Sequence, residues 1–344
     1  MTATEWRRIE LTAFGGPENL HLVTEHTLPE PGPGQVRVKV LAAGTGFTDT
    51  IVRQGQYVDV KEKPPFTPGY DWVGIVDALG SGVSTCQVGD TVADMPAIGG
   101  YTQYLCVDAD HVVPCPAGLD PVKAVCMMLS YTTAWQMLTR ECTLQPGDAI
   151  LVHAAGGAVG TALLELAREL KLTVYGTASQ SKHDLVRSFG AIPIDYRNTD
   201  FVAEVQRLTQ GKGVQAVFDT IGGRSWSRSY RCVAKGGRLV GFGALQVTTG
   251  DESVPSLLWG FAKLLGLWRL LPDGRSSSFY NILSRRKKLP DEFRTDVATL
   301  MQWLGDERLH PAVAEVRPLR DAAEVHRLID AGAVAGKIVL DCQG

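Results

Sequence analysis

The sequence predicts an α/β protein of two domains, one made of short antiparallel strands and the other of a doubly wound parallel sheet. The chain has 344 residues, about twice the ~150 residues of an average domain. Residues 1–125 are rich in glycine and proline and carry short strand-like runs. From residue 126 onward, apolar strand-like runs alternate with helical patterns. This alternation with short connections is typical of a parallel sheet with helices on both faces.

The first domain is predicted from alternating side chains and from turn signals. Apolar and polar side chains alternate at 35–41, and Asp77 interrupts an apolar run at 73–79. Clusters of turn-forming residues separate such runs, at 29–34, 64–69, 80–83 and 88–90. Many short strands joined by tight turns indicate an antiparallel, barrel-like β domain.

The end of the chain is expected to return to this first domain. Helical patterns at 296–304 and 321–330 precede a final strand at 338–341. We therefore assign residues 1–125 and 290–344 to the first domain and residues 126–289 to the second. Within the second domain, strands are expected at 149–153, 172–177, 192–195, 214–219 and 238–242, and helices at 161–170, 182–189, 201–208 and 225–233.

The most informative stretch joins the first strand of the second domain to its helix. It reads Ile150-Leu-Val-His-Ala-Ala-Gly-Gly-Ala-Val-Gly160. A dinucleotide-binding fold needs small residues for the tight turn, for the approach of the pyrophosphate and for close helix–strand packing. A helix N-terminus also presents backbone N–H groups to phosphate. This pattern predicts a phosphate-binding loop made of Ala155, Gly156, Gly157, Ala158, Val159 and Gly160.

The next strand end predicts which dinucleotide binds. Sites that prefer NAD usually place Asp or Glu about twenty residues on, where it accepts from the ribose 2′-hydroxyl. Residues 174–182 contain no acidic side chain, but they offer the hydroxyls of Ser179 and Ser181 and the cation of Lys182. These groups suit a 2′-phosphate that carries about two negative charges. NADPH is therefore the expected cofactor; the alternative is that Lys182 is only a solvated residue at a helix start.

Several motifs, spread over essentially the whole chain, resemble one family. They are residues 43–57 (AGTGFTDTIVRQGQY), 68–74 (PGYDWVG), 88–90 (VGD), 129–135, the glycine loop and 331–340 (AGAVAGKIVL). Together they resemble the zinc-free, quinone-oxidoreductase-like branch of the medium-chain dehydrogenase/reductase superfamily. The resemblance implies a GroES-like β-barrel catalytic domain plus a doubly wound Rossmann domain, with the ligand cleft between them. It also implies a homodimer.

The positions that hold catalytic zinc in the zinc-dependent relatives carry other residues here. Gly46 stands where those relatives have a Cys ligand, and Tyr70 stands where they have a His. Neither residue ligates zinc as a thiolate or an imidazole does. We therefore expect no metal and a substrate that is already electrophilic. The resemblance implies hydride transfer from NADPH to a quinone or to the activated C=C bond of an enone, enal or enoyl substrate.

The resemblance also implies which side chains take part in the reaction. Tyr57 matches a tyrosine near the substrate of enoyl-reducing relatives, where a phenol can donate to a developing enolate; the alternative is that it only lines the cleft. Tyr131 is the second catalytic candidate, with packing as its alternative. Asp49 and Arg53, four residues apart, are expected to form a structural pair. Tyr196 is implied beside the adenosine phosphate, and the expected cofactor-binding set is completed by Gly46, Thr133, Phe242, Gly243 and Lys337.

The composition excludes several other classes of protein. With 34 Lys and Arg against 37 Asp and Glu, the formal charge is −3, and no basic excess exists to bind nucleic acid. The N-terminal stretch lacks the apolar core of a secretory signal. Seven scattered cysteines contain no CxxC pair and are expected as reduced thiols. We therefore expect a cytoplasmic protein that acts on a small electrophilic molecule, without stable membrane insertion.

One apolar stretch keeps a second class of function open. Residues 254–271 are expected to form a packed lid or a dimer helix, with a membrane-surface helix as the alternative. The basic run 285–288 is expected as a solvated turn. Because of this apolar stretch and of Gly46, the alternative function is an NADPH-binding protein with little turnover that acts through partner or membrane-surface contacts.

Overall fold

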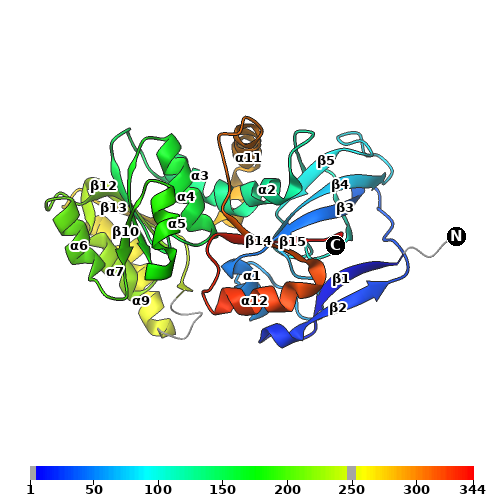
Figure 1. The fold of residues 1–344 in the computed structure, drawn as a ribbon, viewed down its shortest axis with the longest axis horizontal. Coiled ribbons are helices and arrows are strands. Elements are labelled where there is room, and N and C mark those ends of the chain that lie inside the picture. Colours follow the sequence, from blue (N-terminus) through cyan, green and yellow to red (C-terminus); the bar gives the residue numbers. More distant parts are fainter. Residues whose placement is uncertain (1–4, 246–252) are drawn as a thin grey trace. The chain divides into compact units, whose positions relative to one another are not determined.

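The structure, a computed structural model, describes residues 5–245 and 253–344 and divides the chain into two units (Figure 1). Unit 1 comprises residues 1–132 and 291–344, and unit 2 comprises residues 133–290. The domain boundary expected at residue 125 falls inside a helix, α2 (Pro121–Cys126). The α/β class predicted from the sequence is confirmed.

Unit 1 is built around a mostly antiparallel sheet of seven strands in the order β14-β15-β3-β4-β5-β7, with β6 paired to β3. A separate hairpin consists of β1 and β2. The strands of unit 1 are β1 (Trp6–Leu11), β2 (Leu20–Glu25), β3 (Gln35–Gly44), β4 (Asp71–Leu79), β5 (Thr91–Asp94), β6 (Tyr104–Asp108), β7 (Val113–Pro114), β14 (Val313–Pro318) and β15 (Lys337–Asp341). Its other helices are α1 (Phe47–Arg53), α11 (Pro290–Gly305) and α12 (Ala322–Asp330).

The last strand completes the sheet of unit 1 from the far end of the chain. Strand β15 pairs with β14 on one side and with β3 on the other, where Val339 lies opposite Gly44. The alternation of side chains in β3 buries Val36, Val38 and Val40 in one core. Leu340 joins the same core, so apolar burial fixes the register of the closing strand.

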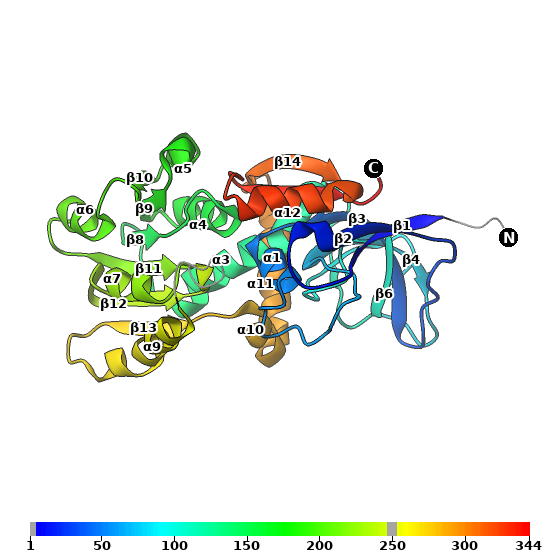
Figure 2. The ribbon, with the colours of Figure 1, turned by 90° about the horizontal axis from the view of Figure 1, so that it is seen from below.

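Unit 2 is built around a parallel sheet of six strands in the order β10-β9-β8-β11-β12-β13, which can be followed from top to bottom in Figure 2. The strands are β8 (Ala149–Val152), β9 (Thr173–Ala178), β10 (Ile192–Asp195), β11 (Val214–Asp219), β12 (Val233–Gly241) and β13 (Ser276–Phe279). The helices include α3 (Thr132–Gln136), α4 (Ala158–Glu169), α5 (His183–Ser188), α6 (Phe201–Leu208), α7 (Arg224–Tyr230), α9 (Val254–Leu265) and α10 (Ile282–Lys288). The predicted doubly wound sheet is thus confirmed.

The basic run 285–288 differs from its sequence-based expectation. It forms the last turn of α10, a helix that begins after Asn281, whose side chain accepts a hydrogen bond from the backbone N–H of Ser284. Arg285 is partly shielded, with its guanidinium 2.8 Å from the Glu141 carboxylate, whereas Lys287 and Lys288 are exposed. The expected turn is wrong because a capping residue orders the segment as a helix, but the two lysines are solvent-exposed as expected.

Helix α9 uses one face for packing and leaves another exposed. Leu264 is buried in the core of unit 2, and the Phe261 ring packs edge-on against Trp226 at 4.9 Å between ring centroids. The exposed apolar face, by which we mean the large apolar side chains open to solvent on α9 and the turn after it, consists of Val254, Leu258, Trp259, Leu265, Leu267 and Leu270. In the described part of the chain, no helix has the length and apolar content that crossing a bilayer requires.

Candidate functional site

The carboxyl ends of the parallel strands of unit 2 bring most of the predicted cofactor residues of that unit to one edge of the sheet. The chain runs outward from β8 to β9 and β10 and then crosses to β11 on the other side of β8. In open α/β sheets, ligands bind at such a switch point, beyond the carboxyl ends of the strands. The glycine loop follows β8 at this switch point.

The glycine loop has the strand–turn–helix geometry that the sequence predicts. Ala155 N–H donates to the carbonyl of Thr177 at 3.0 Å, and Gly157 is the N-cap of α4. A Cβ on Gly160 would lie 2.3 Å from the carbonyl oxygen of Ala154, so only glycine allows α4 to begin this close to the loop. No side chain caps the N–H groups in the first turn of α4. Such uncapped N–H groups are what a helix start needs in order to bind phosphate.

The cation of Lys182 lies beside the glycine loop, and the charge of Arg197 is close enough to act on it. The Lys182 side chain covers Gly156, where an added Cβ would come within 2.8 Å of the lysine Cδ. Burial, followed by the nearby charge of Arg197, lowers the pKa of Lys182. Arg197 also lies over the ring of Tyr196, 5.8 Å from its centroid. Sequence reasoning missed Arg197, although its position directly after the expected Tyr196 was a usable signal.

The hydroxyl groups predicted for this subsite lie at the end of β9. The Ser179 and Ser181 hydroxyls are hydrogen-bonded to each other at 3.2 Å and stand in a short turn before α5. Tyr196 follows β10 and is 51% exposed. Since β9 and β10 are parallel neighbours, these side chains belong to the same edge of the sheet as Lys182.

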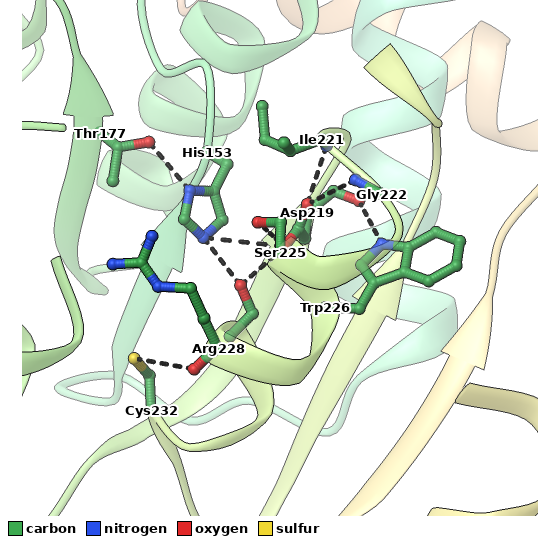
Figure 3. Close-up of polar contacts among 10 residues, drawn as sticks. His153, Thr177, Asp219, Ile221, Gly222, Ser225, Trp226, Arg228 and Cys232 are labelled. Atoms are coloured by element: carbon green, nitrogen blue, oxygen red, sulfur yellow. Dashed lines mark hydrogen bonds and ion pairs between the residues drawn. The ribbon is translucent and has the colours of Figure 1, made fainter. Parts of the chain in front are cut away.

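A buried polar network lies directly behind the glycine loop (Figure 3). The His153 ring contacts the hydroxyls of Thr177 at 3.0 Å and of Ser229 at 2.9 Å. Asp219 is fully buried and accepts hydrogen bonds from the hydroxyls of Ser225 and Ser229, at 2.9 and 2.6 Å. Strands β8, β9 and β11 are thereby tied to α7 at the switch point.

The donors of this network fix the form of its histidine. Ser229 donates its proton to Asp219, so its oxygen accepts from Nε2–H of His153, and Nδ1 accepts from Thr177. Burial lowers the pKa of His153, which outweighs the opposing influence of Asp219 and keeps the ring neutral. The network is fully enclosed, so it acts as a support for the loop.

Three other predicted cofactor residues have defined places in unit 2. Phe242 and Gly243 directly follow β12, and Phe242 N–H donates to the carbonyl of Asp219 at 3.1 Å. A Cβ on Gly243 would lie 2.4 Å from the Thr220 hydroxyl, so a side chain there would collide with the end of β11. The Thr133 hydroxyl is buried and has no hydrogen-bond partner among the described residues.

The predicted catalytic Tyr57 belongs to unit 1 and forms a pair with Tyr70. The two phenol oxygens are 2.7 Å apart, and the rings meet edge to face with centroids 5.8 Å apart. Tyr70 is fully buried, whereas Tyr57 is partly exposed. Burial raises the pKa of Tyr57 to about 12, although the hydrogen bond with Tyr70 opposes this rise. Both phenols therefore keep their protons at neutral pH.

A cluster of buried charges lies beside the tyrosine pair. Lys337 and Asp71 form an ion pair, with Nζ 3.1 Å from a carboxylate oxygen, and both are almost completely buried. Although burial disfavours the ammonium, the negative charge of Asp71 raises the pKa of Lys337. Asp49 accepts from the N–H groups of Gly46 and Tyr70. Burial and the charge of Asp71 raise the pKa of Asp49 to about 7.

The structure replaces one expected pair and gives Lys337 a partner. Arg53 does not pair with Asp49, so that expectation is wrong; its guanidinium bonds to Asp330 at 2.8 Å and to the carbonyl of Gly15. The backbone N–H groups that occupy Asp49 explain the difference. Lys337, expected at the cofactor, contacts Asp71 in unit 1, and its cofactor role stays a prediction.

Gly46 and Tyr131 complete the predicted set. Gly46 has an extended backbone with φ of −164°, and the nearest atom to an added Cβ would be Asp49 Oδ2 at 3.9 Å, so the site has room for a side chain. Tyr131 is 2% exposed, in the irregular helical segment Met127–Tyr131. No group of three or more metal-binding side chains occurs within residues 5–245 and 253–344.

The sequence matches two protein families, the alcohol dehydrogenase GroES-like domain over residues 32–117 and the zinc-binding dehydrogenases over residues 190–340. The synaptic vesicle membrane protein VAT-1 homolog of Rattus norvegicus is 32% identical, covering 97% of this chain and 83% of that protein. A 2-haloacrylate reductase of a Burkholderia species is 31% identical, covering 95% and 96%. Escherichia coli quinone oxidoreductase, solved with NADPH, has a TM-score of 0.85 and 28% identity, covering 97% and 99%.

The chain has a GroES-like unit followed by a Rossmann-type unit, and this order of units is that of dehydrogenases and reductases with two domains. The chain belongs to the quinone oxidoreductase/VAT-1-like branch of the medium-chain dehydrogenase/reductase superfamily. The resemblance identified from the sequence motifs is therefore confirmed. Its relatives include a quinone oxidoreductase and a 2-haloacrylate reductase.

Proposed function

We propose that this protein is an NADPH-dependent reductase that transfers a hydride to a quinone or to an activated C=C bond without a zinc ion. The observation that carries the proposal is the cation of Lys182, with the charge of Arg197 near it, beside a glycine loop at the switch point of a parallel sheet. The related reductases act on quinones and on 2-haloacrylate, as their names state, and both substrates are electrophilic.

The residues of unit 2 fit a dinucleotide with a 2′-phosphate. Gly160 keeps the start of α4 close to the loop, and the uncapped N–H groups of that helix suit the pyrophosphate. Lys182 and Arg197 supply the positive charge that a 2′-phosphate needs, and Ser179 adds a hydroxyl donor. Among the described residues the buried hydroxyl of Thr133 has no hydrogen-bond partner, and we propose that the cofactor supplies one.

NADPH, when bound, supplies the hydride. The roles that we assign to the protein are binding and electrostatic stabilisation. Tyr57 donates its phenolic hydrogen bond to the substrate oxygen, on which negative charge develops as an enolate or hydroquinone anion forms. Water then protonates the product. Gly46 and Tyr70 occupy the positions of two zinc ligands and offer neither thiolate nor imidazole, so the substrate must be electrophilic without a metal.

A panel of substrates tests the proposal. A quinone, an enone, an enal and an enoyl thioester are each mixed with protein and NADPH, and the loss of NADPH absorbance is followed. We expect turnover with at least one class and much slower turnover with NADH. Tight NADPH binding without turnover on any of the four would overturn the proposed reaction.

A second candidate function rests on the exposed apolar face of α9. An NADPH-binding protein with little turnover could use Leu258, Trp259 and Leu270 to contact a partner or a membrane surface. Co-sedimentation with anionic phospholipid vesicles tests the membrane form of this idea, with Trp259→Ser as the control variant. The homodimer and the cytoplasmic location also remain proposals, and light scattering of the purified protein tests the former.

A further inference from the structure

Tyr57 and Tyr70 share one hydrogen bond, and the burial of Tyr70 determines its direction. Each phenol has one proton, so only one of the two can donate across the 2.7 Å between the oxygens. Tyr70 is fully buried, and among the described residues Tyr57 is the only hydrogen-bond partner of its hydroxyl. If Tyr57 donated, the buried proton of Tyr70 would have no acceptor, which is unfavourable. Tyr70 is therefore the donor.

This direction leaves the proton of Tyr57 free for an acceptor outside the pair. Tyr57 is partly exposed, so that acceptor is water or a bound ligand. Because its oxygen already accepts a hydrogen bond from Tyr70, the O–H of Tyr57 is polarised and donates more strongly. The order of the bonds is Tyr70 to Tyr57 to ligand.

Backbone hydrogen bonds hold the segments that carry both tyrosines. Tyr70 N–H donates to the Asp49 carboxylate at 3.0 Å, and Asp49 also accepts from Gly46 N–H at 2.9 Å. The turn that carries Tyr57 is closed by a hydrogen bond from Gln56 N–H to the carbonyl of Ile51 at 3.0 Å. The geometry of the pair is thus set by the protein before any ligand binds.

The charged groups around the pair favour its protonated form. Asp49 and Asp59 both raise the pKa of Tyr57 and of Tyr70, in addition to the larger effect of burial. Neither phenol is therefore a base at neutral pH, and each can only donate or accept hydrogen bonds.

From this geometry we infer that Tyr70 is a positioning residue, which orients the Tyr57 hydroxyl as a hydrogen-bond donor to the substrate oxygen. Tyr70 does not itself touch the substrate. The inference rests on the proposed function for its catalytic meaning, but the order of the two hydrogen bonds can be measured without turnover.

A double-mutant cycle on an enone substrate tests the inference. Tyr70→Phe lowers kcat by about threefold, and Tyr57→Phe lowers it by about tenfold. In a protein that already carries Tyr57→Phe, adding Tyr70→Phe changes kcat no further, because Tyr70 acts only through Tyr57. KM for NADPH stays constant in all variants. Independent, multiplying losses in the double variant would overturn the inference.

A matched control separates this effect from a general loss of stability. Tyr230→Phe also removes a buried phenol hydroxyl, which bonds to Asp273 at 3.1 Å, but it lies at the C-terminal end of α7, away from the carboxyl ends of the strands. We expect wild-type kcat for this control. Equal losses of kcat in Tyr230→Phe and Tyr70→Phe would contradict a specific role of Tyr70.

The NMR signal of the Tyr57 ring decides the order of the bonds independently of turnover. With tyrosine labelled at Cζ, the Tyr57 resonance moves downfield in Tyr70→Phe, because its oxygen loses a donor, and it stays in place in Tyr230→Phe. An unchanged resonance, or an upfield move as expected for loss of an acceptor, would overturn the inference. If the wild-type protein reduces nothing in the panel while the resonance shifts, the proposed function fails and the assigned hydrogen-bond order stands.

Discussion

At the scale of single residues, we expect the catalytic contribution of Tyr57 to be small, because water can partly replace it. An oxyanion donor contributes up to about 3–4 kcal/mol in an enclosed site. Tyr57 is partly exposed, so we expect Tyr57→Phe to slow turnover of an enone about tenfold, or about 1.4 kcal/mol. Steady-state rates and NADPH titrations measure this. Complete loss of turnover with intact NADPH binding would instead make Tyr57 an obligatory acid, and no change would make it a wall of the pocket.

Lys182 is expected to distinguish the two nicotinamide cofactors. If Lys182 contacts the 2′-phosphate as proposed, Lys182→Ala should weaken NADPH by ~1–2 kcal/mol, with NADH nearly unchanged. Arg187→Ala is the control, since Arg187 carries a charge on the nearby helix α5 but pairs with Asp184 at 2.9 Å. Fluorescence titration of wild type and both variants gives the dissociation constants for NADPH and NADH that test this expectation. Equal weakening of both cofactors by Lys182→Ala would refute the assignment.

At the scale of elements, we expect two glycines of the loop to be needed for different reasons, Gly160 for packing and Gly157 for cofactor binding. A Cβ at Gly160 would meet the backbone at 2.3 Å, whereas one at Gly157 would make an ordinary contact at 3.4 Å. Gly160→Ala should therefore destabilise the cofactor-free protein by about 1–3 kcal/mol, the usual cost of overpacking. Gly157→Ala should leave that stability within about 0.5 kcal/mol but weaken NADPH binding.

Urea unfolding without cofactor, together with NADPH titration of the folded variants, checks this pair of substitutions. The expected pattern is a loss of stability in one variant and a loss of affinity in the other. Equal stability of the two variants would show that α4 can move away from the loop without cost.

The elements that the sequence predicted best are those with strong periodicity. The bounds expected for β10, α6 and β11 agree with the structure because each is a regular segment between clear turn signals. Strand β13 was missed because its sequence, SSSF, has no apolar run, and it becomes a strand only by pairing with β12. Edge strands of this kind depend on tertiary context.

The candidate site also has a part that a local sequence pattern predicts and a part that it does not. The loop 155–160 and Lys182 could be predicted because the chemistry lies in one continuous stretch. The Tyr57–Tyr70 hydrogen bond, the proximity of Arg197 to Lys182, and the His153 network join residues from separate elements. No local pattern reports such contacts, since they arise only when the strands are paired.

At the scale of the whole molecule, His326 couples the stability of the fold to pH. It is fully buried, its Nε2 lies 3.3 Å from the Tyr101 hydroxyl, and its Nδ1 has no partner among the described residues. Burial, helped by the charge of Arg53, lowers its pKa from 6.5 to about 3. Between these values the unfolded chain binds a proton that the folded protein does not, so acid destabilises the fold.

The variant His326→Gln removes this proton uptake and isolates its effect. At pH 5, about 1.5 units below the unfolded pKa, the histidine should cost wild type about 2 kcal/mol relative to pH 7. The stability difference between wild type and variant should therefore shrink by that amount on going from pH 7 to 5. Asp49, whose raised pKa acts in the opposite sense, is present in both proteins and cancels. Denaturant unfolding at both pH values measures the difference, and a constant difference would refute the role of His326.

The place of β15 in the sheet of unit 1 has a consequence for how the protein is made. Strand β3 needs β15 as its neighbour, and these two strands lie near opposite ends of the chain, whereas unit 2 is one continuous stretch of it. As the polypeptide leaves the ribosome, the middle of the chain can therefore reach its final form first. The opening strands must wait, with Ala42–Gly44 of β3 uncovered on one edge, until β15 has been made.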